Sequence, residues 1–447
     1  MNHPAKLLAC LLGTALALAV LPAQAQTLLV RAGKLFDVDQ GRVLSDQVVR
    51  IEAGNIISVS PYSAAAMAPA GATELRVIDW SAYTVLPGLI DLHTHLVGDI
   101  QSSNIAAPLM SSAARDALVG AHNARDTLYA GYTTVRDVGV YRAFTDVALR
   151  DAIARGDVEG PRMFVAGAYI TVTQGGGEVT GLAPDVLVPG EMRRGVADNE
   201  VQIRQRVREL LAGGADFIKV IATGAVLTAG TEPGAPEYSE SEIRAAVEEA
   251  SLHGTFVAAH AHGAEGIKRA VRAGVRTIKH GSYLDDEGIV LMKQHGTWLV
   301  ADVYNGDYIE EVGRKDGWSE EILRKNRETT QTQRDGFAKA VRAGVRIGFG
   351  TDSGVYPHGT NARQFAYMVR LGMSPMQAIQ AATINAARSM GHEAEFGSIA
   401  AGKSADLIAV PGDPLHDIEV LRQVQSVIEQ GRVVCAPGER PCHQDRH

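Results

Sequence analysis

Two histidines separated by one residue, His93 and His95, follow the apolar segment 86–92. In a β-strand the side chains of residues i and i+2 point to the same side, so these two imidazoles would lie next to each other. Two adjacent imidazoles at the end of a strand provide a pair of ligands for a metal ion such as zinc. The alternative is a pair of polar residues on a strand edge, but the residues found further along the chain favour the metal site.

Further residues of metal-binding type stand at the ends of other predicted strands. They are Lys219, His260, His262, His280 and Asp352. His260 and His262 share one strand face, so both can point into one site. One of the two is needed as a ligand, for which His260 is favoured, and the other would form hydrogen bonds there. His280 precedes Gly281 at a strand end, which favours a ligand over a buried core histidine.

Lys219 is the unusual member of this set, because a protonated ammonium group repels a metal ion and is costly to bury. A role at the metal requires that its charge is removed, for example by carboxylation with CO2. Carboxylation would create an anionic oxygen ligand that can bridge two metal ions. The alternative is a lysine that caps carbonyl groups at the end of a strand.

The segments that carry these residues are short apolar runs that alternate with helical stretches. The clearest helix is predicted over 239–253, with a capping box of Ser239 and Glu242 at its start and Gly254 after its end. Eight strands are predicted, at 85–92, 133–136, 163–166, 217–221, 255–260, 277–280, 298–301 and 345–350. Eight such alternations predict an α/β fold, a (β/α)8 TIM-like barrel, whose active site lies at the C-terminal ends of the strands.

Both ends of the chain look different from this middle part. Residues 27–85 and 397–434 are rich in short β-strands punctuated by Gly, Asn and Asp, and they predict one small β-sandwich domain built from both ends. The 447 residues suit a barrel plus such a domain. The expected division is a signal peptide (1–25), the β-domain's first part (26–85), the barrel (86–396), and the β-domain's second part with a C-terminal tail (397–447).

The N-terminus has the features of a secretory signal. Lys6 precedes the apolar stretch 7–21, and Ala23-Gln24-Ala25 is a small-x-small cleavage site. The mature chain is therefore expected to begin at Gln26, to be periplasmic or secreted, and to keep no stable membrane anchor. The alternative, a retained anchor, is disfavoured because the apolar stretch is short for a membrane span.

Composition and cysteine usage limit the possible functions. The net charge of −8 and the absence of a basic run argue against a nucleic-acid partner. After signal cleavage two cysteines remain, Cys435 and Cys442, which are expected to form a disulfide in an oxidising compartment. No cysteine lies among the residues that could do chemistry, which argues against thiolate catalysis.

Taken together, these motifs resemble the amidohydrolase superfamily. The residues that carry the resemblance are His93-x-His95 after Pro-Gly-Leu-Ile-Asp, Lys219, His260, His280, and Asp352 within Gly-Thr-Asp-Ser-Gly. Segments 214–219, 259–263, 279–281 and 357–361 resemble the imidazolonepropionase-related branch. That branch contains binuclear zinc dipeptidases of the Xaa-Pro and Xaa-Arg type and ochratoxin-hydrolysing amidohydrolases. Imidazolonepropionase itself is mononuclear and cytosolic, so the export signal and Lys219 weigh against that activity.

The resemblance implies two zinc ions per chain, bridged by Lys219 carboxylated with CO2. One zinc would be held by His93, His95 and Asp352, and the other by His260 and His280. Zinc lowers the pKa of its bound water toward 7 and so supplies the attacking hydroxide. A second metal, or a histidine such as His262, can polarise the amide carbonyl. Asp352 would take a proton and pass it to the leaving nitrogen.

The expected function is an exported amidohydrolase that releases the C-terminal amino acid from dipeptides or N-acyl amino acids. Alternatives on the same site are an ochratoxin-type N-acyl phenylalanine hydrolase, a cyclic amide or lactone hydrolase, and a deaminase; a non-catalytic periplasmic binding protein is more distant. A substrate carboxylate calls for a cationic or tyrosyl anchor. The substrate-binding candidates are Arg136, Tyr238, His262, His358, Asn361 and Arg363. The resemblance also implies a homo-oligomer, of which an octamer is one form.

Overall fold

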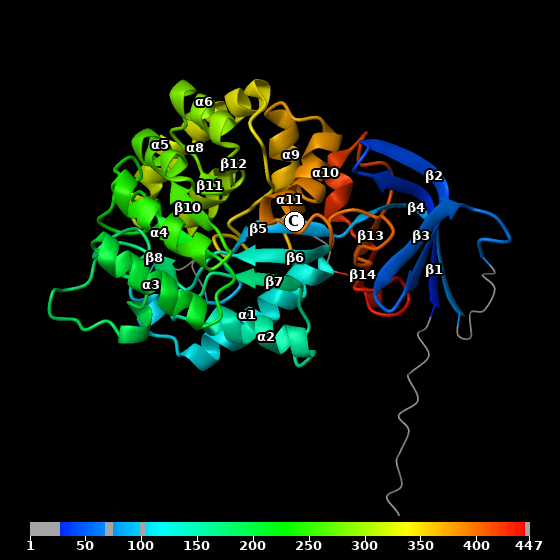
Figure 1. Ribbon diagram of the computed structural model, residues 1–447, viewed down its shortest axis with the longest axis horizontal. Helices are drawn as coiled ribbons and strands as arrows, with labels where there is room; N and C mark the ends of the chain where they lie inside the picture. The colour runs from blue at the N-terminus through cyan, green and yellow to red at the C-terminus, as the bar shows by residue number, and fades with distance from the viewer. Residues whose placement is uncertain (1–26, 68–74, 99–103, 443–447) are drawn as a thin grey trace, which may run out of the picture.

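The computed structural model describes residues 27–67, 75–98 and 104–442. It consists of a barrel surrounded by helices and of a β-sheet domain beside it (Figure 1). The predicted signal peptide, residues 1–25, lies outside the described residues. Within the described ranges, no helix is both long and apolar enough to span a membrane.

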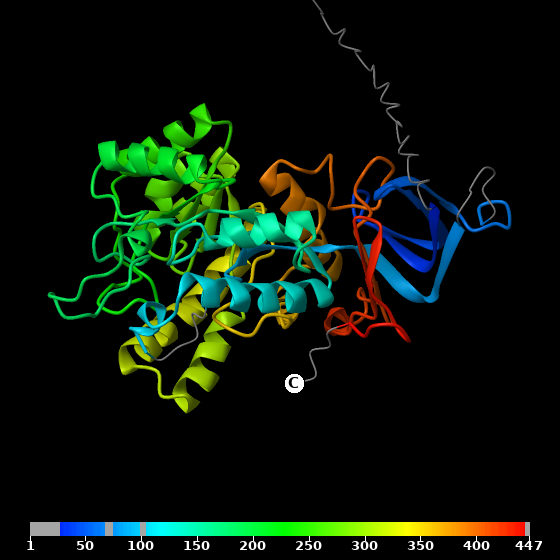
Figure 2. The same ribbon diagram turned by 90° about the horizontal axis from the view of Figure 1, so that it is seen from below.

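The sheet domain is built from both ends of the chain, as the sequence predicts. Its strand order is β15-β14-β13-β4-β1-β2-β3. In chain order these strands are β1 (Thr27–Asp37), β2 (Arg42–Glu52), β3 (Asn55–Pro61), β4 (Leu75–Pro87), β13 (Leu407–Val410), β14 (Ser426–Glu429) and β15 (Arg432–Cys435). β4 joins the two halves because it pairs with β1 on one side and with β13 on the other. The N-terminal and C-terminal strands therefore lie side by side in both views (Figures 1 and 2).

One apolar core lies inside this domain, although its seven strands form a single hydrogen-bonded sheet. Val30, Ile51, Trp80, Leu407 and Ile428 come from both halves of the sheet and belong to one buried cluster. The sheet bends far enough that Ile56 of β3 donates its N–H to the Lys403 carbonyl at 2.8 Å. The sandwich-like core is therefore made by one sheet that folds over on itself.

The barrel strands form two hydrogen-bonded groups, β5-β6-β7 and β8-β9-β10-β11-β12. They are β5 (Leu89–Thr94), β6 (Tyr132–Asp137), β7 (Arg162–Val165), β8 (Tyr169–Ile170), β9 (Ile218–Ile221), β10 (Val257–Ala261), β11 (Thr277–His280) and β12 (Trp298–Val300). The predicted strand at 85–92 is divided at Gly88 between β4 and β5. A Cβ atom at Gly88 would lie 2.1 Å from the Thr133 hydroxyl, so the chain passes there only without a side chain.

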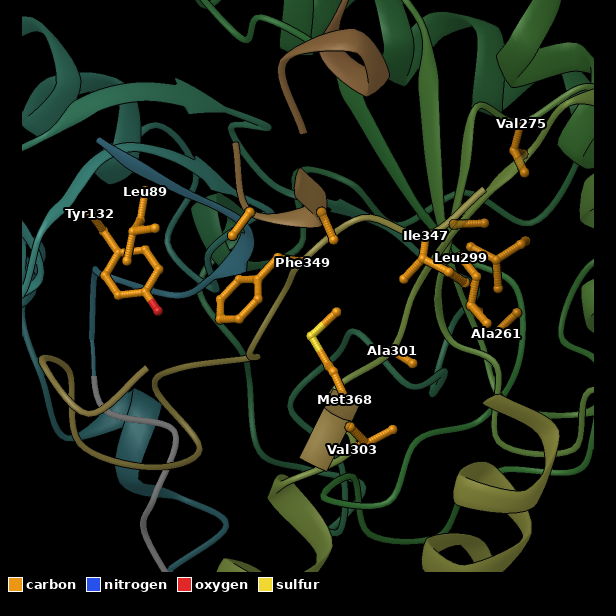
Figure 3. Close-up of a cluster of buried hydrophobic side chains, with 14 of the residues drawn as sticks. Leu89, Tyr132, Ala261, Val275, Leu299, Ala301, Val303, Ile347, Phe349 and Met368 are labelled. Atoms are coloured by element: carbon orange, nitrogen blue, oxygen red, sulfur yellow. The ribbon is translucent and has the colours of Figure 1, made fainter. Parts of the chain in front are cut away.

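The eighth predicted strand, 345–350, is present as an irregular segment that closes the barrel. Leu299 of β12 donates its N–H to the Arg346 carbonyl at 2.8 Å, and Leu92 of β5 donates to the Phe349 carbonyl at 3.0 Å. On the opposite side, Asp216 donates its N–H to Val165 of β7 at 2.8 Å and so connects β7 to β9. Ile347 and Phe349 lie in the buried cluster between the two strand groups (Figure 3).

Helices surround the barrel, most of them on its outer face (Figure 1). They are α1 (Ala113–Tyr129), α2 (Thr145–Arg155), α3 (Glu200–Ala212), α4 (Glu240–Leu252), α5 (Ala264–Ala273), α6 (Asp286–His295), α7 (Asn305–Tyr308), α8 (Glu320–Ala343), α9 (Arg363–Arg370), α10 (Pro375–Ala381) and α11 (Ile384–Met390). α4 confirms the predicted helix, with the capping box of Ser239 and Glu242 at its start.

A buried ion pair and a disulfide tie the sheet domain to the barrel and fix the tail. Arg162 of β7 donates to the Asp406 carboxylate at 2.9 Å, and Asp406 also accepts the Gln430 N–H at 2.8 Å. Cys435 and Cys442 form the predicted disulfide. The two domains are thus joined by a charged contact whose carboxylate side chain is only 5% exposed.

Asp406→Ala should lower the free energy of unfolding by about 3 kcal/mol, because it leaves the Arg162 charge without its buried partner. Asp157→Ala is the matched control, since Asp157 pairs with Arg155 on the surface at 2.9 Å and should change stability by less than about 0.5 kcal/mol. Urea unfolding of both variants measures the difference. Equal effects of the two substitutions would contradict the importance of the buried pair.

Candidate functional site

Eight polar side chains meet at the C-terminal ends of the barrel strands. Each is less than one tenth exposed, and all of them line one cavity of about 180 Å³. They are His93 and His95 at the end of β5, Lys219 on β9, His260 and His262 at the end of β10, His280 on β11, Asp302 after β12, and Asp352 after segment 345–350. All six predicted metal ligands are therefore in one place.

The first group of donors is His93, His95 and Asp352. The Nε2 atoms of the two histidines lie 3.1 and 3.2 Å from the same carboxylate oxygen, Asp352 Oδ1. Asp352 has a φ of +58°, which is costly for a residue with a side chain. It is held there because its N–H donates to the His93 carbonyl at 2.7 Å. A backbone contact between the two strand ends thus sets the position of the carboxylate.

The second group of donors is His260, His262 and His280, whose ligand atoms lie within 4.8 Å of one another. His260 Nε2 contacts the Gly224 carbonyl at 3.2 Å, and a carbonyl only accepts, so Nδ1 keeps its lone pair. His262 Nδ1 contacts the Ser282 hydroxyl at 2.7 Å. The structure thus brings both His260 and His262 to this group, although the sequence favours His260 as the ligand.

Burial favours the neutral imidazole in three of these histidines, which is the form of histidine that binds metal ions. It lowers the pKa values of His93, His260 and His262 well below the usual value, and nearby positive charges lower them further. Burial also lowers the pKa of Lys219 to about 7, against the opposing attraction of Asp352. Near neutral pH, Lys219 is therefore an uncharged amine in a substantial fraction of the molecules.

The chemistry of the donor set fits a metal centre. Two of its buried nitrogen atoms, His93 Nδ1 and His280 Nε2, have no hydrogen-bond partner among the described residues, and burying such atoms unpaired is unfavourable. Imidazole nitrogen and carboxylate oxygen are both common ligands of zinc in proteins. The residues could therefore hold metal in each of the two groups.

Asp302 is a site residue that the sequence analysis missed. It accepts hydrogen bonds from His280 Nδ1 at 3.0 Å, from Gln333 at 2.9 Å and from Asn305 at 2.8 Å. Burial alone would raise its pKa, but attraction to His280 lowers the pKa below the usual value. Asp302 directly follows the predicted strand 298–301, so the strand-end rule that identified the other residues could have found it.

Two predicted substrate-binding residues lie outside the cavity. Arg136 is fully buried inside the barrel, where it donates to the Leu92 carbonyl and the Thr277 hydroxyl, both at 3.2 Å. The Tyr238 hydroxyl donates to the Ala197 carbonyl at 2.7 Å and is likewise buried. Their positions support the barrel walls and offer nothing to a substrate.

The two predicted residues from segment 357–361 lie behind the site. His358 Nε2 contacts the His95 carbonyl at 3.1 Å, and Asn361 donates to the Asp91 carboxylate at 2.8 Å. Neither lines the cavity. Of the substrate-binding candidates, His262 alone is found among the described lining residues.

The cavity walls are largely uncharged. Lys219 is the only lysine or arginine among the described lining residues, so of the expected cationic or tyrosyl anchors for a substrate carboxylate the cavity offers tyrosines, Tyr141 and Tyr169. One wall is apolar and comprises Val226, Ile309, Ile322 and Val355, which belong to one buried cluster. The site therefore favours an apolar group beside the metal-binding donors.

Comparisons with known proteins agree with this geometry. Residues 84–434 match the model of the amidohydrolase family. The chain belongs to this family. It is 33% identical over 383 residues to the ochratoxinase of Aspergillus niger, covering 81% of this chain and 78% of that protein. It is 25% identical over 421 residues to the imidazolonepropionase of Chromobacterium violaceum, covering 87% of this chain and 91% of that protein.

A solved structure of a Xaa-Pro dipeptidase with bound methionine is also similar. It is 38% identical, matches 91% of this chain and 99% of that one, and has a TM-score of 0.84. These comparisons confirm the resemblance seen in the sequence and the barrel fold. This amidohydrolase is a hydrolase that acts on amide bonds.

Asp302→Asn should weaken metal binding by about 10- to 100-fold. The neutral amide accepts only a weaker hydrogen bond from His280 Nδ1 than the carboxylate does, so it fixes the tautomer of His280 less firmly. Asp307→Asn is the matched control, since Asp307 is exposed and does not line the cavity. Competition with a chromophoric zinc chelator measures the affinity. Unchanged affinity in Asp302→Asn would show that Asp302 does not orient His280 for a metal.

Proposed function

We propose that this chain is a two-zinc hydrolase that releases the C-terminal amino acid from N-acyl amino acids or dipeptides. The observation that carries the proposal is the pair of adjacent donor groups in one cavity, with the His93 and His280 rings 4.9 Å apart and Lys219 also lining it. When bound, the metal ions would activate a water molecule and polarise the amide carbonyl. The other steps fall to side chains of the protein.

Lys219 supports the binuclear form of the site because its amine is partly neutral near pH 7. A neutral amine can form a bond from Nζ to the carbon of CO2 and release a proton to solvent. The resulting carbamate is an anion, and each of its two oxygen atoms could bind one metal ion. Carboxylation would thus turn a group that repels metals into a bridging ligand.

In the proposed reaction, Asp352 moves the proton. Asn305 donates to its Oδ2 atom at 3.2 Å, and Oδ1 faces the two histidines. In the proposed reaction, the water oxygen bonds to the carbonyl carbon and a water proton passes to Asp352. The C–N bond then breaks as Asp352 returns that proton to the leaving nitrogen.

The cavity walls suggest which amides are cleaved. The apolar wall of Val226, Ile309, Ile322 and Val355 suits an apolar side chain or acyl group. A charged side chain there would lose its hydration without gaining a partner, which is unfavourable. An N-acyl phenylalanine of the ochratoxin type falls within this apolar class.

The zinc-loaded enzyme should therefore cleave N-acetyl-methionine or N-acetyl-phenylalanine with a kcat/KM at least about 10-fold above that of N-acetyl-aspartate or N-acetyl-lysine. Amino-acid release measured over a panel of N-acyl amino acids and dipeptides tests this. Asp352→Asn is the control for contaminating hydrolases, and it should lower kcat by about 10²- to 10⁴-fold. Hydrolysis of lactones or cyclic amides alone would contradict the proposal.

We also propose that the chain is exported, because the first 25 residues have the charge, apolar stretch and cleavage site of a signal peptide. The disulfide between Cys435 and Cys442 is consistent with an oxidising compartment. N-terminal sequencing of the protein from its host should begin at Gln26. Recovery of the intact N-terminus from a cytosolic fraction would contradict export.

A further inference from the structure

Tyr169 presents a hydroxyl group to the cavity beside the first donor group. It is the first residue of β8, and its ring lies 5.9 Å from the His95 ring and 5.8 Å from the Tyr141 ring. The hydroxyl lies 3.1 Å from His95 Nδ1. Within the described part of the chain, this nitrogen is the only polar atom that the hydroxyl contacts.

The tautomer of His95 decides what this hydroxyl can do. His95 Nδ1 also lies 3.1 Å from the Gly139 carbonyl. A carbonyl oxygen only accepts, so Nδ1 carries the hydrogen and donates it. An Nδ1–H group cannot accept a hydrogen bond from the Tyr169 hydroxyl. The phenolic oxygen can only accept, sharing the Nδ1 hydrogen with the Gly139 carbonyl. The hydrogen of the Tyr169 hydroxyl is therefore left without an acceptor in the described protein.

The ring of Tyr169 is held in place by close backbone packing. A Cβ atom at Gly139 would lie 2.7 Å from the ring, and one at Gly177 would lie 2.9 Å from the Tyr169 Cβ atom. Two glycines thus form a slot that admits the tyrosine. A hydroxyl fixed in this way loses little conformational entropy when it binds a ligand. Pre-organised catalytic donors share this property.

We propose that Tyr169 is a catalytic residue whose hydroxyl donates a hydrogen bond to the carbonyl oxygen of the scissile amide. This rests on the proposed amide hydrolysis. As the attacking water bonds to the carbonyl carbon, negative charge develops on that oxygen and the hydrogen bond becomes stronger. A tyrosine hydroxyl has an ordinary pKa of about 10, so at neutral pH the phenol keeps the hydrogen that it donates. The hydrogen stays on Tyr169, and no bond to it breaks.

Tyr169→Phe tests the assignment because it removes the hydroxyl and keeps the ring. Tyr132→Phe is the matched control, because Tyr132 does not line the cavity and its buried hydroxyl has no hydrogen-bond partner among the described residues. Its ring lies among the apolar side chains of Figure 3. In the zinc-loaded full chain, Tyr169→Phe should lower kcat/KM for the best N-acyl amino acid by about 10²-fold. It should keep the wild-type zinc content. Tyr132→Phe should stay within about 3-fold of wild type.

A second readout separates a catalytic hydroxyl from one that only supports His95. A phosphonate analogue of the tetrahedral species should bind about 10²-fold more weakly to Tyr169→Phe, while the product amino acid binds as before. Equal weakening of both ligands, loss of zinc, or a kcat/KM near wild type would overturn the assignment. A wild-type enzyme that cleaves no amide would overturn the proposed function as well. An active wild type with an equally active Tyr169→Phe overturns only this inference.

Discussion

Backbone hydrogen bonds between β5 and residues 346–353 hold the two halves of the site together. Leu92 donates to Phe349, Asp352 donates to His93, and His95 donates to Ser353, at 2.7 to 3.0 Å. These bonds close the barrel and also place a carboxylate from the last segment against two imidazoles from the first strand. The same contacts that complete the fold therefore assemble the first donor group, and the second group follows on the neighbouring strands β10 and β11.

A buried carboxylate supports this junction from behind. Asp91 accepts hydrogen bonds from the His93 N–H, from the Thr351 hydroxyl at 2.6 Å and from Asn361 at 2.8 Å, and burial raises its pKa to about 6. Deeper in the barrel, Arg136 and Lys279 both donate to the Leu92 carbonyl. Burial lowers the pKa of each of these cations, to about 9 for Arg136. Polar groups inside the barrel thus fix the strand that carries His93 and His95.

The sequence predicts which strand ends carry chemistry better than it predicts how deep a side chain lies. Strand periodicity shows that His260 and His262 share a face, and both are found in the cavity. The same periodicity cannot show that Arg136 lies on an inward face below the strand ends, where its partners are backbone and a threonine. The eighth strand was expected as regular, but Gly348 and Gly350 allow close approach of Leu92 and Val300, and the segment is irregular. Tyr169 depends on a glycine slot that forms only when distant segments meet, so no local pattern indicates its role.

We propose that the two donor groups hold two metal ions bridged by Lys219. Anomalous diffraction at the zinc absorption edge, from crystals of zinc-loaded protein grown with bicarbonate, tests it most directly. We expect two zinc peaks, one against His93, His95 and Asp352 and one against the β10–β11 histidines, with continuous density from Lys219 Nζ to a carboxylate between them. A single zinc peak, with an unmodified Lys219, would contradict a two-metal centre bridged by this lysine.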